Sequence, residues 1–196
     1  VSFSDLTFLF YFLPLFFAVY YIVPFRFKNT VLVLGSAAFY FLGAGVRDCV
    51  LLGASIVLHY ALARGMEGRT VRARRALLVF GLCVDLFGLV YFKYAAFLLE
   101  NLGKLTGTAF SLVELALPLG VSFYLFQSVG YLIGVSRGRP AEKSFVDFSA
   151  FVLAFPQLTM GPILRYDEWR GALKSRTIAR EDVFLGFERF LVGLCF

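Results

Sequence analysis

Charged side chains are scarce in this sequence. Asp, Glu, Lys and Arg make up 16% of the 196 residues, whereas typical soluble domains carry about 25%. Hydrophobic residues make up 60%, and the mean hydropathy is +0.80. This composition excludes an ordinary soluble domain and predicts a membrane protein.

Residues that carry common catalytic and metal chemistry are equally scarce. His59 is the one histidine, so a Ser/His/Asp arrangement has a single candidate base. Cys49, Cys83 and Cys195 are odd in number, far apart and in or near apolar runs, which argues against disulfides and against a metal site. A phosphate-cradling glycine loop is missing too. No bound cofactor is therefore expected, and basic loops explain the net charge of +6 without nucleic-acid binding.

What the sequence has in abundance is apolar runs separated by short basic loops. The 25 Phe and 10 Tyr suit a surface that meets lipid and its interface. We expect an all-α, polytopic helical membrane protein, with residues 1–196 forming one portion of a single membrane domain. Five spans are expected at 6–24, 30–46, 49–63, 76–92 and 115–135, a re-entrant segment at 148–164, an amphipathic cytoplasmic stretch at 167–182, and the next span from about 183. Span 49–63 falls below the lower limit of about 17 residues for crossing a bilayer.

Lys and Arg are distributed unevenly among the loops. They gather after the first, third and fifth spans and are few after the second and fourth. Short loops rich in these residues stay in the cytoplasm, so the N-terminus, which carries Asp5, is predicted to lie on the periplasmic side of a bacterial inner membrane. No cleaved signal peptide is predicted, because the first residues lack basic side chains.

The stretch AFPQLTMGPILRY, residues 154–166, is apolar but contains two prolines, Pro156 and Pro162, with Gly161 before the second. Proline removes a backbone donor and breaks a helix. The loop that follows is basic, so a full crossing would place it on the wrong side of the membrane. We therefore predict a re-entrant segment, with residues 155–165 lining a cavity open to the cytoplasm. A proline-kinked spanning helix is the alternative.

Span 115–135 carries polar side chains along one face. Pro118 and Gly120 loosen its start. The polar residues that follow are Ser122, Tyr124, Gln127, Ser128 and Tyr131, and the last four share one side of a helix. This side faces either a polar cavity or another helix to which it hydrogen-bonds. In the cavity interpretation, Ser122, Tyr124, Gln127 and Gln157 line a tunnel.

Arg165 lies at the predicted cytoplasmic edge, directly after the proline segment. A guanidinium at this place suits a phosphate-bearing donor such as a coenzyme A thioester. The alternative is that Arg165 only anchors the segment at the membrane surface.

Two ionisable residues fall inside predicted spans. Asp85 lies near the middle of span 76–92, where a carboxylate costs about 2.5–3.5 kcal/mol, so a proton or a polar group from another span should compensate it. His59 lies in span 49–63, and a buried imidazole bonded to a neighbouring helix is the favoured interpretation. A functional role is the alternative, since ionisable groups in spans are often functional.

Two stretches together resemble a known family. LPLGVSFYLFQSVGYLIGVSRG, residues 117–138, followed by DFSAFVLAFPQLTMGPILRY, residues 147–166, is similar to the paired signature of the membrane-bound O-acyltransferase family. The likeness is strongest to the bacterial branch of alginate O-acetylation and teichoic-acid D-alanylation proteins, and it extends over almost the whole chain. In this signature Pro118, Gly120, Pro156, Gly161 and Pro162 set the backbone.

The resemblance implies a multi-span enzyme that moves an acyl group, usually acetyl, from a cytoplasmic donor such as acetyl-CoA to hydroxyls of an exported polymer, of the alginate type. The family's catalytic histidine belongs to its C-terminal half, and His59 does not match that motif. We therefore expect an N-terminal part that is inactive alone, with no catalytic residue of its own. Expected partners are membrane lipids, the C-terminal half, a periplasmic acetyltransferase and polysaccharide export proteins. A non-catalytic membrane scaffold and, less favoured, a transporter are the alternatives.

Overall fold

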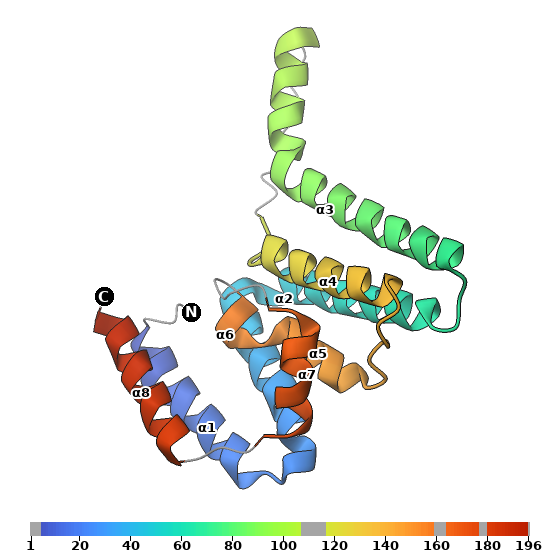
Figure 1. The fold of residues 1–196 in the computed structure, drawn as a ribbon. Coiled ribbons are helices and arrows are strands. Elements are labelled where there is room, and N and C mark those ends of the chain that lie inside the picture. The colour runs from blue at the N-terminus through green and yellow to red at the C-terminus, as the bar shows by residue number, and fades with distance from the viewer. Residues whose placement is uncertain (1–4, 107–116, 159–163, 177–179, 196) are drawn as a thin grey trace.

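The computed structural model describes residues 5–106, 117–158, 164–176 and 180–195, which form helices joined by turns, with no strand among them (Figure 1). A π-helical turn, Phe8–Phe12, leads into α1, Leu13–Ile22, and a 3₁₀ turn, Phe25–Phe27, leads into α2. The remaining helices are α2 (Lys28–Met66), α3 (Val71–Thr106), α4 (Val121–Ser136), α5 (Phe145–Leu153), α6 (Phe155–Leu158), α7 (Tyr166–Lys174) and α8 (Arg180–Cys195). The predicted all-α class is confirmed for these residues.

Helix α2 contains a sharp change of direction where two separate spans were predicted. Gly45 has φ 81° and ψ −179°, a conformation that L side chains rarely adopt. The helix resumes at once, so the break between its two parts lies at Gly45, next to the boundary predicted between 46 and 49. The second part runs from 46 to 66. At 1.5 Å per residue it is roughly 31 Å long, which is longer than the predicted span 49–63 and long enough to cross a bilayer.

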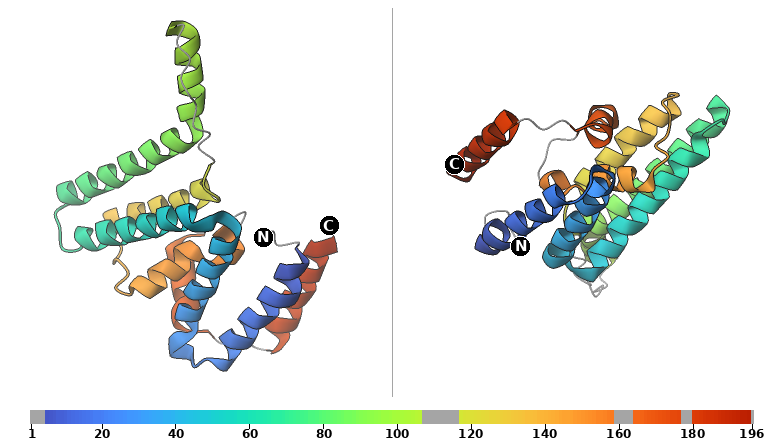
Figure 2. Two further views of the ribbon diagram at one scale, coloured as in Figure 1. Left: turned by 180° about the vertical axis from the view of Figure 1, so that it is seen from behind. Right: turned by 90° about the horizontal axis from the view of Figure 1, so that it is seen from below.

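Helices α2, α3 and α4 pack together (Figure 1). They approach closely at Gly81 of α3, where an added Cβ atom would lie 3.0 Å from side-chain atoms of both Leu62 and Leu132. Glycine here lets α3 lie against the other two helices. The predicted span 76–92 falls within α3, and the later part of that helix projects away from the rest of the protein (Figure 2).

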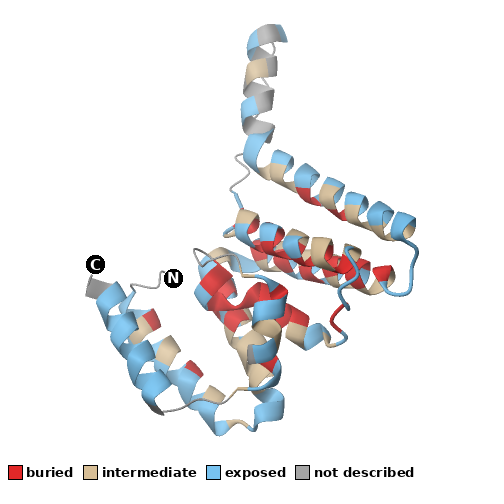
Figure 3. Ribbon diagram, viewed as in Figure 1, coloured by how far each residue is buried: buried red, intermediate tan, exposed pale blue. Residues whose placement is uncertain are grey.

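Helix α5 packs on α2 and α4, and buried residues concentrate along these three helices and the short α6 (Figure 3). Phe155 of α6 inserts into an aromatic cluster between α1 and α2. Its ring centroid lies 5.2 Å from that of Phe16 and 5.7 Å from that of Phe39. Such edge-to-face and tilted contacts hold α1 against α6.

Two helices among the described residues, 25–66 and 71–94, are long and apolar enough to cross a membrane, judged by length and composition. Shorter apolar helices cover 8–22 and 121–136. The five-span count therefore stays a prediction. In the predicted amphipathic stretch 167–182, the described residues fall mainly in α7 and at the start of α8, and residues 177–179 lie outside the described part. The run expected from 183 continues α8, which begins at Arg180.

Candidate functional site

The turn before α4 is fixed by two side chains of α2. Asp48 Oδ2 accepts a hydrogen bond from the Leu119 N–H at 3.1 Å, and the Tyr40 hydroxyl donates to the Leu119 carbonyl at 2.7 Å. Both backbone groups of Leu119 are thus satisfied although the turn is not helical. Non-helical backbone within a membrane protein needs such partners.

Gly120 follows in this turn, and its geometry explains why this position is a glycine. Its φ is +68°, and a Cβ atom would lie 2.5 Å from the carbonyl oxygen of Leu158 in α6. Both the backbone conformation and the close approach require a residue without a side chain. The two stretches that carry the family resemblance therefore touch at Gly120 and Leu158, while Pro118 beside them is fully buried.

The break between α5 and α6 occurs at Ala154, two residues before Pro156. Ala154 has φ −50° and ψ 112°, so the α-helical ladder stops. Ser36 of α2 accepts a hydrogen bond from the Phe155 N–H at 3.1 Å. Pro156, which has no N–H to satisfy, occupies the first turn of α6, where that loss costs least.

The carbonyl of Phe151, left without its helical partner, accepts two amide groups. Gln127 Nε2 of α4 and Gln157 Nε2 of α6 each donate to it at 2.8 Å. Gln157 Oε1 is buried and has no hydrogen-bond partner among the described residues. Two of the residues predicted to line a tunnel thus meet at one carbonyl, and the break is held by side chains from three elements.

A pocket of about 380 Å³ lies between α4 and the segment that enters α7. Gln127 and the buried Tyr131 of α4 contribute to its lining, and Arg137, Arg139 and Arg165 contribute their cations. Asp167 also lines it and forms an ion pair with Arg139. The charge of the lining is positive, which suits an anionic ligand with phosphate groups.

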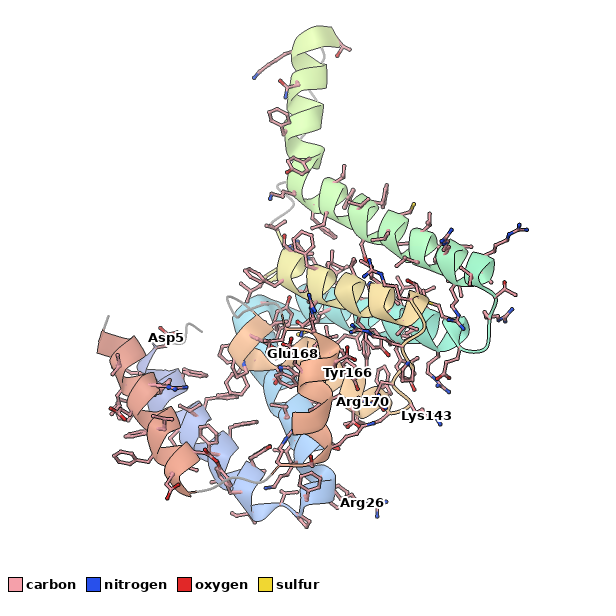
Figure 4. The ribbon with its side chains drawn as sticks, in the orientation of Figure 1. Asp5, Arg26, Lys143, Tyr166, Glu168 and Arg170 are labelled. Carbon is pink, nitrogen blue, oxygen red and sulfur yellow. The ribbon has the colours of Figure 1, made fainter. Side chains whose placement is uncertain are left out.

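Glu142 holds the connection between α4 and α5 against α7. Its side chain is only 3% exposed. Oε2 accepts the Tyr166 hydroxyl at 2.6 Å and contacts Lys174 Nζ at 3.0 Å, and Oε1 accepts the Ser144 N–H at 3.1 Å. Tyr166 and Arg170 lie on α7, next to the segment that carries Lys143 (Figure 4). Glu142 thereby positions the residue that follows Arg165.

The electrostatics of Glu142 follow from these partners. Burial raises the pKa of its carboxyl group, but the hydrogen bonds from Tyr166 and the Ser144 N–H, together with Lys174, outweigh burial and lower the pKa from 4.5 to about 2. Burial and the neighbouring carboxylate raise the pKa of the Tyr166 hydroxyl. The sequence interpretation missed Glu142. A single acidic residue within the basic loop 137–143, just before the Ser144 helix cap, was the available indication.

The predicted site residues other than Pro118, Gly120 and Pro156 fall into three groups. Gln127 and Arg165 line the pocket, and Arg165 is exposed at the start of α7. Tyr124 and Gln157 are buried, and Ser122 is half-buried, but these three do not line the pocket. Gly161 and Pro162 lie outside the described residues.

The two ionisable residues inside predicted spans are partners. His59 Nε2 lies 3.0 Å from Asp85 Oδ2, and both side chains are buried between α2 and α3. Asp85 thus has a polar partner on another helix, as the cost of a carboxylate inside an apolar helix requires. His59 is the buried imidazole bonded to a neighbouring helix. Neither residue lines the pocket.

Comparison with known proteins adds an independent finding. The chain is 38% identical to a probable alginate O-acetylase AlgI of Azotobacter vinelandii, over 97% of this chain and 40% of that protein. It is 39% identical to the protein of the same name in Pseudomonas aeruginosa, over 97% of this chain and 38% of the relative. A peptidoglycan O-acetyltransferase of Helicobacter pylori is 30% identical, over 98% of this chain and 43% of that protein.

The chain spans about two fifths of the length of these curated relatives. No family model matches it, and no solved structure gives a significant match. The high coverage of this chain by relatives that share one name, together with apolar helices able to cross a membrane, agrees with the resemblance seen in the sequence. Over nearly its whole length, the chain is therefore similar to AlgI-like O-acetyltransferases.

Proposed function

We propose that this chain forms the donor-binding part of a membrane O-acetyltransferase that acetylates hydroxyls of an exported polysaccharide or cell-envelope polymer. The observation that carries the proposal is the pocket at the start of α7, which combines the amide of Gln127 with the cations of Arg137 and Arg165. A donor such as acetyl-CoA carries phosphates, which guanidinium groups bind well. The names of the relatives, alginate O-acetylase and peptidoglycan O-acetyltransferase, support the class of acceptor.

In this proposal the pocket opens to the cytoplasm of a bacterial cell. The protein lies in the inner membrane with its N-terminus outside, and residues 148–164 enter from the cytoplasm and return. The basic loops after α1, α2 and α4 support this orientation. The broken backbone at Ala154, satisfied by Ser36 of α2, supports a re-entrant segment buried in protein.

Acetyl transfer itself requires more than the described residues offer. The pocket supplies cations and amides, which bind and orient a donor, but its lining contains no histidine to act as a base. We therefore assign residues 1–196 to binding and not to chemistry, and propose that they are inactive alone. The part of the relatives beyond the matched length supplies the base, and a periplasmic acetyltransferase and export proteins act as partners.

The first experiment tests the donor pocket in a form of the protein that has acetyl-transfer activity. Arg165→Gln removes one pocket cation and is expected to raise the KM for acetyl-CoA at least tenfold with a smaller effect on kcat, since it removes ground-state binding. Arg72→Gln, an exposed residue at the start of α3 that does not line the pocket, is the matched control. An unchanged KM for Arg165→Gln, or an equal rise in both variants, would place the donor elsewhere.

The second experiment tests the orientation. Single cysteines at Ser144, Gln157 and Ser175 are labelled with a membrane-impermeant reagent from each face of the membrane. The proposal requires that positions 144 and 175 react from the cytoplasm and that position 157 reacts only through a water-filled path. Labelling of position 175 from the periplasm would mean that the segment crosses the bilayer.

A further inference from the structure

A second pocket, of about 280 Å³, lies between α1, α6 and α7 and differs in character from the first. Its lining is almost entirely hydrocarbon and aromatic, with Phe16 and Tyr20 from α1, Phe155 from α6 and Trp169 from α7. An apolar cavity of about 150 Å³ already holds a benzene ring. A pocket of this size and lining suits a segment of an acyl chain.

Cations collect at one end of this pocket, around the ring of Tyr20. The Arg176 guanidinium lies 5.7 Å from the ring centroid, donates to the Tyr20 hydroxyl, and donates to Asn29 Oδ1 at 2.7 Å. Lys28 Nζ lies 5.3 Å from the same centroid. Arg26 lies in the 3₁₀ turn that precedes α2 (Figure 4). The pocket is therefore apolar along its length and positively charged at its end.

Asn29 and Asp147 lie beside this cationic end. Asp147 accepts a hydrogen bond from Asn29 Nδ2 at 2.7 Å, so its carboxylate faces the amide nitrogen while Arg176 faces the amide oxygen. Asn29 thus stands between the carboxylate and the guanidinium. The described contacts of Lys28 are the ring faces of Tyr20 and Tyr21.

We propose that this pocket binds one anionic phospholipid of the surrounding bilayer. The phosphate lies beside Arg176 and Lys28, and one acyl chain lies on the rings of Phe16, Phe155 and Trp169. The charge at the pocket's end selects an anionic headgroup over a zwitterionic one, because basic side chains at a membrane surface attract anionic lipids. The apolar lining selects a lipid over a free phosphate. This site is separate from the donor pocket and does not depend on the proposed acetyl transfer.

The chain carries its own reporter for this site, because Trp169 is its single tryptophan. The 196-residue chain is reconstituted in nanodiscs of phosphatidylcholine that contain a few mole per cent of lipid with brominated acyl chains, which quench indole fluorescence on contact. Brominated phosphatidylglycerol is expected to quench Trp169 several-fold more than brominated phosphatidylcholine at the same mole fraction. The preference should weaken at high salt, and inorganic phosphate should not abolish it.

Variants assign the preference to the two cations. Lys28→Gln with Arg176→Gln should bring quenching by phosphatidylglycerol to the level of phosphatidylcholine, whereas Arg72→Gln, with the same loss of charge, should leave the preference intact. Lys28→Gln alone leaves the hydrogen bonds of Arg176 and Asn29 in place, so it separates the loss of a charge from a folding defect. This variant should reduce the preference for phosphatidylglycerol by half or more. Equal quenching by both lipids, absence of quenching, competition by inorganic phosphate, or a preference that survives the double variant would each overturn the proposal.

Discussion

His59 Nε2 lies 3.0 Å from Asp85 Oδ2 in the buried contact between α2 and α3. The other ring nitrogen, Nδ1, lies 2.8 Å from the carbonyl oxygen of Ser55, which can only accept. Nδ1 is thus placed to donate to that carbonyl, and Nε2 shares a hydrogen bond with the carboxyl group of Asp85. Each of the two buried side chains therefore has its polar partner within the protein.

This pairing makes a prediction about stability. Asp85→Leu leaves the imidazole without its partner and should lower the free energy of unfolding by about 3–5 kcal/mol, the range for one member of a buried pair. Asp85→Asn retains a polar group at the same place and should cost less than half as much. Denaturant unfolding in detergent, followed by circular dichroism, measures both. A Leu variant as stable as the Asn variant would show that the contact contributes little.

The pair also illustrates what the sequence could and could not predict. Hydropathy placed His59 and Asp85 inside apolar helices, and the cost of each in a membrane required a partner. Their pairing was not predicted, since periodicity defines the face of one helix and leaves open the register between two helices. Similarly, Pro156 predicted a broken segment, but Ser36, which satisfies the break, lies 119 residues before Phe155. Such a contact depends on tertiary packing alone.

Glycine substitutions test the contact between the two stretches that carry the family resemblance. Gly120→Ala must place a side chain at φ +68° and 2.5 Å from the Leu158 carbonyl. The backbone conformation alone costs about 1–2 kcal/mol, and the clash adds to this. Gly53→Ala in α2, where an added Cβ meets nothing within 4 Å, is the matched control and should be neutral or slightly stabilising. Thermal unfolding of both variants would separate the two effects, and equal midpoints would contradict the close packing at Gly120.

Glu142 predicts a dependence of stability on pH. Its pKa in the folded protein, about 2, lies below its ordinary value of 4.5, so folding favours the ionised form. The contribution to stability is therefore complete above pH 4.5 and is lost as the pH falls from 4.5 toward 2. At pH 7, Glu142→Gln should unfold at a lower temperature than the parent chain, and this difference should shrink steadily between pH 4.5 and pH 2.

The control for Glu142 is Glu168→Gln, the same chemical change at an exposed position of α7. It should track the parent chain across this pH range. If the gap between Glu142→Gln and the parent chain were the same at pH 7 and pH 2.5, the buried carboxylate would not be held ionised by Tyr166 and Lys174.

Ser36 provides the most local test of the broken segment. Ser36→Ala leaves the Phe155 N–H without its acceptor inside the protein, and an unsatisfied buried donor costs about 1–3 kcal/mol. Ser136→Ala removes a hydroxyl that donates to the Ile133 carbonyl of its own helix, so it should cost much less. Hydrogen exchange adds a second measurement, because the Phe155 amide should exchange faster in Ser36→Ala while amides in the middle of α4 keep their protection. If Phe155 stayed as protected as in the parent chain, the break would draw its stability from the Phe151 carbonyl and its two glutamines instead of from Ser36.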